Sequence, residues 1–266
     1  MTSSRKPLAV VTGASSGIGL ELAKQFAANG FDLLIAAEED AVHDAARTLS
    51  SHGVHVDAVQ ADLSTFNGVE QLVAAATAND RPVDALAVNA GIGVGGDFVR
   101  DTDLESNLKI VNLNCTSAVH LSKRLLPGMV ERGRGRVLYT SSIAATGPGP
   151  YHAVYAASKA FLASFSEALR EELKDTGVTV TALMPGPTDT RFFERAGMED
   201  TKVASGHKDD PAEVAREGFQ ALMEGKDHVV AGSLRNKVQA AASRILPDPL
   251  KAKMQEKMTK PGSGDG

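Results

Sequence analysis

Short apolar runs alternate along the chain with longer stretches of helical periodicity. Runs of four to eight apolar residues bounded by Gly, Asn, Asp or Pro are typical of buried strands. The stretches between them have the spacing of amphipathic helices. This alternation predicts one α/β domain, with a doubly wound, mostly parallel seven-stranded sheet of the Rossmann type. The predicted strands are 8–12, 32–37, 54–60, 83–88, 136–140, 178–184 and 228–231.

We expect this domain to span residues 1–234. A helix is predicted from Leu104 to Arg132, with a bend or break at Pro127 because proline removes a helical hydrogen bond. A lid is expected at about 187–208, where three large apolar residues stand among many charges and a glycine. Its apolar side chains indicate an apolar ketone or secondary alcohol as substrate, unless they only anchor the lid. They are Phe192, Phe193 and Met198.

Residues 235–266 are expected to form a helical extension, with a disordered end from Pro261. Within it, Leu250, Met254 and Met258 recur every four positions among lysines, which predicts a basic amphipathic helix. Such a helix could dock on a partner subunit, cover the mouth of a pocket or touch a membrane surface. Three apolar residues are too few for stable membrane attachment, so packing on protein is favoured.

Composition narrows the classes of function. The chain has 266 residues, of which 42% are hydrophobic, enough for one sizeable core. Its net charge of −5 counts against nucleic acid as a partner. No apolar run approaches the ~18 residues that span a membrane, and the first residues lack a signal-peptide pattern. Cys115 is the single cysteine, and we expect its thiol to be buried and inert. A cytoplasmic protein fits these features.

A glycine-rich turn joins the first predicted strand to the helix that follows. In this layout one glycine permits the tight turn, another lets backbone approach a phosphate, and a third lets the helix pack closely on the strand. The helix N-terminus adds partial positive charge. A plain strand-to-helix turn is the alternative. The residues expected to hold a dinucleotide's pyrophosphate are Gly13, Ser15, Ser16, Gly17, Ile18 and Gly19.

A carboxylate, Glu38, follows the second predicted strand nineteen positions after Gly19. That is where a ribose 2′-hydroxyl is held in dinucleotide sites. No Arg or Lys lies between Glu38 and Ala46 to receive a 2′-phosphate. A carboxylate about 4 Å from a phosphate charge costs on the order of 4 kcal/mol at an effective dielectric of 20. We therefore expect NAD rather than NADP. Glu39 and Asp40 are expected only to start the next helix.

Further polar residues and glycines follow the other strands. The carboxyl ends of parallel strands share one edge, where such sheets bind ligands, so these residues converge on one site. Asp62 could bond an adenine amino group or cap the helix that begins at Thr65. The other cofactor candidates at this edge are Leu63, Asn89, Ala90, Gly91, Pro185, Gly186, Thr188 and Thr190.

The candidate chemistry lies after the fifth strand. Tyr155 and Lys159 are four positions apart in a helical stretch, which puts a phenol and an ammonium on one helix face. A nearby cation lowers the pKa of a phenol from ~10, and three units of lowering need ~4 kcal/mol. One ammonium in a partly dry site can supply roughly that much. Ser142 can donate a hydrogen bond to a substrate oxygen. An ordinary amphipathic helix with a surface lysine is the alternative.

These residues resemble the short-chain dehydrogenase/reductase family. The similar motifs are the glycine turn after Thr12, the Asn89-Ala90-Gly91 segment, the Ser142–Tyr155–Lys159 spacing and the loop after Pro185. They cover roughly residues 8–190, in the family's order. Asn112 stands in a Val-Asn-Leu sequence where the family carries its catalytic asparagine.

The resemblance implies hydride transfer between NAD(P) and a secondary alcohol, ketone or aldehyde. Tyr155 would exchange the proton, and Lys159 would bond the nicotinamide ribose and lower the phenol's pKa. Ser142 would fix the substrate oxygen. Asn112 would hold a water linked to Lys159, with Asn114 as the less favoured holder. A homodimer or homotetramer, paired through the helices that hold Cys115 and Tyr155, is also implied.

Neighbouring side chains have weaker assignments. Ser141 is expected to be structural, and His120 to be a satisfied buried side chain. His152, three positions before Tyr155, could face the pocket or lie on the surface. Two other functions stay open, a catalytically silent NAD(P)-binding regulator and a 3-ketoacyl-thioester reductase. The long C-terminal extension counts against the second.

Overall fold

The computed structural model describes residues 5–78, 80–243 and 246–265. Its seven strands form one sheet in the order β3-β2-β1-β4-β5-β6-β7, and every strand pair is parallel. The predicted parallel sheet is confirmed, with β3 and β4 each starting two residues later than expected. The strands are β1 (Leu8–Thr12), β2 (Asp32–Ala37), β3 (Val56–Gln60), β4 (Ala85–Val88), β5 (Gly135–Thr140), β6 (Val178–Pro185) and β7 (His228–Ala231).

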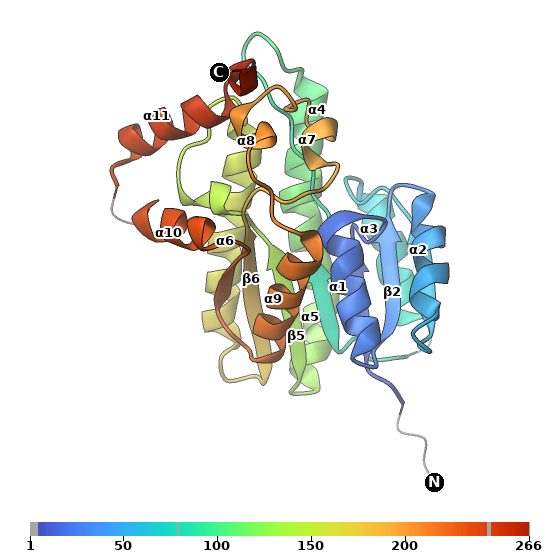
Figure 1. Cartoon of the computed structure of the whole chain (residues 1–266). Coiled ribbons are helices and arrows are strands. Elements are labelled where there is room, and N and C mark those ends of the chain that lie inside the picture. The colour runs from blue at the N-terminus through green and yellow to red at the C-terminus, as the bar shows by residue number, and fades with distance from the viewer. Residues whose placement is uncertain (1–4, 79, 244–245, 266) are drawn as a thin grey trace.

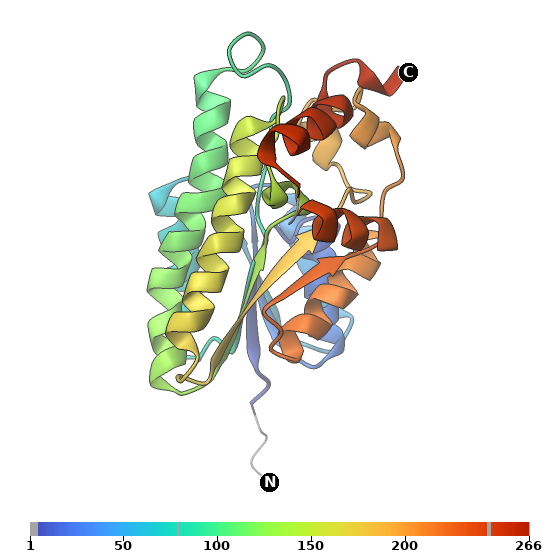
Figure 2. The same ribbon diagram turned by 90° about the vertical axis from the view of Figure 1, so that its left-hand side faces the viewer.

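Helices cover both faces of the sheet (Figures 1 and 2). Each face has its own apolar cluster. One cluster joins the sheet to α1, α2 and α9, and the other joins it to α3, α5 and α6. This is the doubly wound arrangement. The helices are α1 (Gly17–Ala28), α2 (Ala41–Ser50), α3 (Phe66–Thr77), α5 (Ser117–Glu131), α6 (Ala153–Leu173) and α9 (Pro211–Met223).

Covering both faces explains why the strands are continuous apolar runs. Val10 and Leu34 belong to one cluster, and their chain neighbours Val11 and Ile35 to the other. All four are at most 3% exposed. Side chains of a strand alternate between faces, so a strand buried on both sides needs apolar residues at every position.

The long helix predicted over 104–132 is irregular at residues 111–116 and not at Pro127, where a bend or break was expected. Helix α4 (Leu104–Ile110) passes into a π-helical segment, Val111–Thr116, which continues directly into α5. Pro127 lies inside α5, and the helix runs on for another turn. Of the predicted bend or break at Pro127, the break is wrong: the proline removes one helical hydrogen bond, the one to the carbonyl of Lys123, and the helix continues past it.

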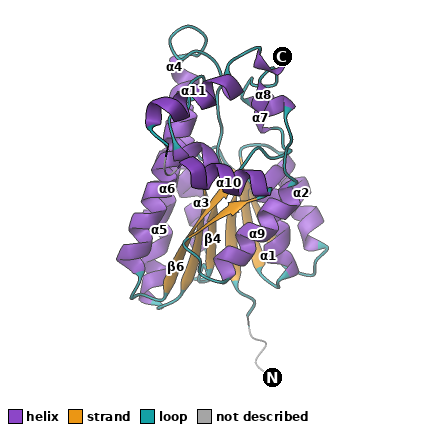
Figure 3. Ribbon diagram, turned by 60° about the vertical axis from the view of Figure 1, so that its left-hand side comes forward, coloured by secondary structure: helices purple, strands orange, loops and turns teal. Residues whose placement is uncertain are grey.

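The carboxyl edge of the sheet is covered by the segments between and after the last strands (Figure 3). The 187–208 segment holds two short helices, α7 (Phe192–Arg195) and α8 (Lys202–Ser205), around a small apolar cluster of its own. After β7 come α10 (Leu234–Ser243) and α11 (Asp248–Thr259). The predicted C-terminal helix is confirmed, and α10 was not predicted as a separate helix.

The C-terminal end packs on the 187–208 segment. The amide of Gly264 donates to the carbonyl oxygen of Asp200 at 2.8 Å, and the amide of Lys202 donates to Ser263 Oγ at 3.0 Å. A Cβ at Gly264 would lie 2.9 Å from that same Asp200 oxygen, so glycine permits this approach. The expected disorder from Pro261 is therefore wrong as far as residue 265, and Gly266 lies outside the described residues.

The sequence predicted no membrane-spanning segment, and the helices can be checked for one. Within the described residues, none of them combines the length and the apolar character that crossing a bilayer requires.

Candidate active site

A cavity of about 1030 Å³ lies at the carboxyl edge of the sheet. Its lining includes the ends of β1 and β4, which are neighbours in the sheet although β2 and β3 come between them in the chain. Such a reversal of strand order leaves a crevice where α/β sheets bind ligands. Every residue that the sequence assigned to the cofactor lines this cavity, and so does Ser142.

The glycine turn fits a phosphate group. Gly13 and Gly17 have φ of +68° and +55°, a backbone region that favours glycine. A Cβ at Gly19 would lie 2.1 Å from the Gly13 carbonyl oxygen. Helix α1 begins here with no acidic residue in its first turn and no capping side chain within the described part of the chain. Its first N–H groups, and the partial positive charge that they carry, are therefore open to a pyrophosphate.

Asn89 ties the strands together beneath this turn. Its Nδ2 donates to the carbonyl oxygen of Thr12 at 3.0 Å, and its Oδ1 accepts from Thr140 Oγ1 at 3.1 Å. The side chain thus bridges the ends of β1 and β5 from the end of β4. Ala90 and Gly91 follow it along the cavity wall. Asn89 fixes the shape of the cofactor-binding edge.

The two carboxylates after β2 both pair with cations from distant segments. Lys109 of α4 donates to Glu38 at 2.9 Å. Glu39 accepts from Ser15 Oγ at 3.1 Å and forms ion pairs with Arg191, at 3.3 Å, and Arg195, both from the 187–208 segment. The sequence between Glu38 and Ala46 does hold no Arg or Lys, but folding brings cations from elsewhere in the chain to both glutamates.

Glu39 is likewise more than the helix-start residue that the sequence suggested, because its carboxylate joins the lid to the glycine turn. Asp40 does precede α2, although its side chain makes no capping hydrogen bond among the described residues.

Asp62 shapes the turn after β3. Its carboxylate accepts from the amide of Ser64 at 2.9 Å, while Thr65 Oγ1 accepts from the amide of Gly68 at 3.0 Å. Thr65 is thus the cap of α3, not Asp62. Burial raises the pKa of Asp62, but the Ser64 hydrogen bonds and the charge of Lys109 outweigh it and the pKa is lowered. Asp62 is held as an anion facing the cavity.

The loop after β6 forms the opposite wall. Thr188 Oγ1 donates to the Gly186 carbonyl at 3.0 Å, and Thr190 Oγ1 accepts from the amide of Phe192 at 3.2 Å. A Cβ at Gly17 would lie 3.0 Å from Thr190 Cγ2, so this loop closes over the glycine turn. A Cβ at Gly186 would lie 2.1 Å from Asn236 Nδ2, which packs α10 against the same loop.

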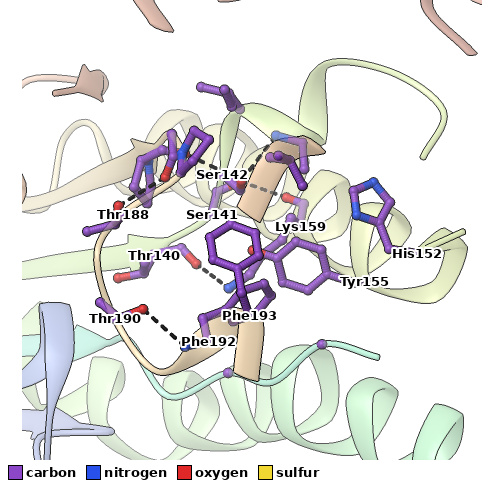
Figure 4. A pocket seen from close by; sticks show the side chains of 18 of the residues that line it. Thr140, Ser141, Ser142, His152, Tyr155, Lys159, Thr188, Thr190, Phe192 and Phe193 are labelled. Atoms are coloured by element: carbon purple, nitrogen blue, oxygen red, sulfur yellow. Dashed lines mark hydrogen bonds between the residues drawn. The ribbon is translucent and has the colours of Figure 1, made fainter. Parts of the chain in front are cut away.

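Ser142, Tyr155 and Lys159 come together in the cavity, as the sequence predicted (Figure 4). Tyr155 and Lys159 lie one turn apart on α6, and the Lys159 Nζ is 5.6 Å from the centroid of the Tyr155 ring. The Lys159 Nζ donates to the carbonyl oxygen of Thr140 at 2.8 Å. Ser142 caps the 3-10 helix Ile143–Thr146 by accepting from the amide of Ala144 at 3.0 Å.

The ionisation of this group differs from the expected one. Burial raises the pKa of Tyr155 to about 12, although its hydrogen bond with Ser142 lowers it in part. Burial lowers the pKa of Lys159 to about 8. The predicted lowering of the phenol's pKa by Lys159 is therefore wrong for the protein alone, because desolvation outweighs an ammonium that faces the Thr140 carbonyl.

The buried asparagine is Asn114, not Asn112. Asn112 is exposed and does not line the cavity. Asn114 is 1% exposed, and its amide exchanges two hydrogen bonds of 3.0 Å with the backbone of Ile92. A Cβ at Gly91 would lie 3.1 Å from Lys159 Nζ and 3.2 Å from Asn114 Oδ1, so both side chains reach the same spot. Both asparagines belong to the π-helical segment Val111–Thr116, and only the side that carries Asn114 is packed on the fold.

The side chains around the group have clear places. His152 is buried and lines the cavity, with its ring centroid 5.9 Å from that of Tyr155. Burial lowers the pKa of His152 to about 4. Ser141 Oγ donates to the backbone oxygen of Lys159 at 2.7 Å, a structural role as predicted. His120 is satisfied by Glu70 at 2.6 Å. Cys115 is half-buried, and burial raises the pKa of its thiol.

Comparison with known proteins supports the geometry. Residues 7–200 match the short chain dehydrogenase family. The chain belongs to this family. Its members are nicotinamide-dependent oxidoreductases, so the protein is an NAD(P)-dependent enzyme that transfers hydride between the cofactor and an alcohol or ketone.

Relatives of this short-chain dehydrogenase come from several bacteria. A Streptomyces coelicolor protein provisionally named a ketoacyl reductase is 38% identical over 196 residues, 71% of this chain and 74% of the relative. The 1-deoxy-11-beta-hydroxypentalenate dehydrogenase of Streptomyces exfoliatus is 36% identical over 205 residues, 74% of each chain. A Sphingobium yanoikuyae short-chain dehydrogenase, solved with NADPH, has a TM-score of 0.78 at 29% identity, covering 84% of this chain and 87% of that one.

The sequence left the placement of two parts of the site open. Phe192 packs its ring on Tyr155, with centroids 5.0 Å apart, and α10 and α11 line the cavity together with the lid. The apolar lid residues were a signal for the first. For the second, the spacing of Leu250, Met254 and Met258 indicated a helix, and the mouth of a pocket was one of the three places predicted for it.

Proposed function

We propose that this protein interconverts an apolar ketone and its secondary alcohol, with Tyr155 as the general acid and base. The observation that carries the proposal is the convergence of Tyr155, Ser142 and Lys159 on the cavity that also holds the glycine turn. A bound nicotinamide cofactor supplies or accepts the hydride. With a pKa of about 12, the phenol is protonated at neutral pH and ready to donate to a substrate oxygen.

The residues around Tyr155 divide the remaining work. Ser142 lines the same cavity as the phenol and can donate to the same substrate oxygen, which stabilises charge that develops there. Lys159 is held by the Thr140 carbonyl, where its ammonium can reach a ribose hydroxyl. Asn114 takes the place proposed for Asn112 and acts as a positioning residue, because its Nδ2 also donates to Ser158 Oγ, next to Lys159, at 2.9 Å.

The cofactor preference follows from Glu38. Its carboxylate lines the cavity after β2 and can accept from ribose hydroxyls, which supports NAD. The Lys109 ammonium at 2.9 Å offsets part of its charge, so a 2′-phosphate would meet less repulsion than from a bare carboxylate. We therefore propose a preference for NAD of about tenfold, or about 1.4 kcal/mol, rather than the several hundredfold of an unpaired acid.

We also propose that the protein is a homo-oligomer paired through α4, α5 and α6. Leu104, Leu108 and Val111 follow one another at helical spacing and are 75%, 50% and 39% exposed, and Phe161 of α6 is 39% exposed. Apolar side chains in such a row support a protein interface. Light scattering of the purified chain tests this: a monomer at micromolar concentration contradicts it, as does an oligomer unaffected by Leu104→Lys.

One screen tests the proposed function. Ketones and secondary alcohols of increasing size are offered to the purified full chain with NAD(H) and NADP(H), and nicotinamide absorbance is followed. Turnover that Tyr155→Phe abolishes is expected. Tight cofactor binding without turnover of any carbonyl or alcohol supports the silent regulator instead.

A further inference from the structure

The C-terminal extension forms one wall of the active-site cavity. Residues of α10 and α11 line it together with lid residues, and Figure 2 shows both helices over the carboxyl edge of the sheet. Helix α11 is fastened to the loop before α6: Thr259 Oγ1 donates to the Pro150 carbonyl at 2.8 Å, and Lys251 Nζ to the Thr146 carbonyl at 3.3 Å. Of the three places open to this helix from the sequence, it takes the mouth of the pocket.

This wall presents apolar side chains to the cavity. Leu234 and Val238 of α10 and Met254 of α11 are 75%, 60% and 53% exposed, and all three line the cavity. On the lid side, Phe192 and the buried Met198 line it too. Exposed apolar side chains gathered around one cavity mark a surface that a ligand covers. The part of the substrate that lies here is therefore apolar.

The acidic and the basic side chains that line the cavity come from different segments of the chain. Its carboxylates, Glu38, Glu39 and Asp62, stand at the carboxyl ends of β2 and β3, beside the glycine turn. The lid and the C-terminal wall contribute basic side chains, and no Asp or Glu of these segments lines the cavity in the part of the chain described. The lysines and arginines are Arg191 and Arg195, which pair with Glu39, Lys202 of α8, Arg235 of α10, and Lys251 and Lys257 of α11.

Three of these cations have no carboxylate partner. Lys251 pairs with Asp248 at 2.7 Å, but Lys202, Arg235 and Lys257 form no ion pair with any described residue. They come from three different helices and face one cavity. Cations that line one cavity without a counter-charge raise its positive potential, so an anion bound there is favoured.

We infer that the substrate is an anionic amphiphile: a ketone or secondary alcohol on an apolar skeleton, with a carboxylate or similar anion at the end away from the reacting oxygen. The reacting oxygen lies at Tyr155, the skeleton lies against Phe192, Val238 and Met254, and the anion lies among Lys202, Arg235 and Lys257. This inference rests on the proposed function, since it names the substrate class of that site.

The experiment compares three forms of one carbonyl compound. Keto acids of increasing length, such as 10-oxoundecanoate, are reduced by the full chain alongside their methyl esters and their N-acetylcysteamine thioesters. We expect kcat/KM for the free acid to exceed that for the ester by about tenfold, equivalent to about 1.4 kcal/mol. The advantage should shrink as salt is added, because exposed charges are screened.

Variants locate the anion. Exchanging all three unpaired cations (Lys202→Gln, Arg235→Gln, Lys257→Gln) should remove the advantage of the acid and leave ester turnover unchanged. Lys253→Gln is the matched control, because Lys253 is exposed on the same helix α11 but does not line the cavity. Unchanged ester turnover also shows that the triple variant folds.

The outcomes separate the two proposals. Equal turnover of acid and ester, or a preference for the thioester, overturns the anionic substrate and leaves the oxidoreductase standing; the thioester result points to a ketoacyl-thioester reductase. An advantage of the acid that Lys253→Gln removes as fully as the triple variant also overturns the inference. Turnover of no carbonyl compound with either cofactor overturns the proposed function itself.

Discussion

The ammonium of Lys159 lies 5.6 Å from the centroid of the Tyr155 ring and donates a hydrogen bond of 2.8 Å to the carbonyl oxygen of Thr140. The end of β5 therefore sets the direction of the lysine on α6. Both side chains are buried, and desolvation moves both toward their neutral forms. At neutral pH the phenol is therefore neutral, whereas Lys159, with a pKa of about 8, is still mostly an ammonium, whose burial costs stability.

Removing the phenolic oxygen should abolish turnover and leave cofactor binding intact. Tyr155→Phe should lower kcat by about 10²–10⁴-fold, the usual contribution of a general acid or base. The dissociation constant for the nicotinamide cofactor, measured by calorimetry, should change little. Tyr151→Phe is the control, because that phenol does not line the cavity. Substantial turnover by the Tyr155 variant would remove Tyr155 from the mechanism.

Replacing Lys159 by Met should stabilise the cofactor-free protein at neutral pH. The pKa of Lys159 falls from 10.5 to about 8 on folding, so below pH 8 the fold bears the full cost of burying the ammonium, up to about 3 kcal/mol. Loss of the Thr140 hydrogen bond offsets about 1 kcal/mol of the gain. Between about pH 8 and 10.5 the unfolded chain binds more protons, so wild-type stability rises and the difference closes.

Thermal unfolding at pH 7 and at pH 10 measures this difference. We expect the melting temperature of Lys159→Met to be higher by several degrees at pH 7, with a clearly smaller gap at pH 10. If the difference in melting temperature between the variant and the wild type did not change with pH, the buried ammonium of Lys159 would not be what destabilises the wild type.

His152 should make the protein sensitive to acid. Burial lowers its pKa from 6.5 to about 4, so between these values the unfolded chain binds a proton that the folded protein does not. Stability therefore falls as the pH drops from about 6.5 to 4, by up to about 3 kcal/mol. Urea unfolding of His152→Gln should show a shallower fall over this range. His52→Gln, at an exposed histidine, should follow the wild type, and parallel curves for all three proteins would refute the assignment.

The Glu39 ion pairs should hold the lid closed. Glu39 joins Arg191 and Arg195 to the glycine turn, and its side chain is 38% exposed. Partly exposed pairs contribute about 0.2–1 kcal/mol each, so Glu39→Gln should speed amide hydrogen exchange over 187–208 by a few-fold. Glu38→Gln is the matched control, because Glu38 pairs with Lys109 outside the lid. Equal exchange in both variants would show that the lid is held by its apolar cluster.

Glu38 should govern the choice of cofactor together with Lys109. Glu38→Ala should raise NADP use relative to NAD, because it removes a carboxylate and leaves the Lys109 ammonium without its partner. The double variant Glu38→Ala, Lys109→Gln should show a smaller increase in NADP use, because it also lacks the Lys109 ammonium. The ratio of kcat/KM values for the two cofactors measures both. If the ratio of kcat/KM values for NADP and NAD were unchanged in Glu38→Ala, Glu38 would not select the cofactor and would only be a residue at the start of the next helix.

Local pattern was enough for the fold and for most of the site. Continuous apolar runs such as Leu33–Ala37 predict strands buried on both faces, and they are buried here. Parallel strands put their carboxyl ends on one edge, so the glycine turn, Ser142 and Pro185 had to converge whatever the details of packing. The spacing of Tyr155 and Lys159 needs only one helical turn. These features depend on residues close in sequence, and the backbone period fixes them.

Only the tertiary structure decided the remainder. Asn114 rather than Asn112 is buried near Lys159, because that side of the segment is the one that packs on the fold, and local sequence does not show which side this is. Glu38 meets a lysine 71 positions away, and α11 closes a cavity made mostly by earlier residues. The pKa of Tyr155 depends on how much water the assembled site excludes. Such properties arise from surfaces brought together by folding, so neighbouring residues in the sequence do not determine them.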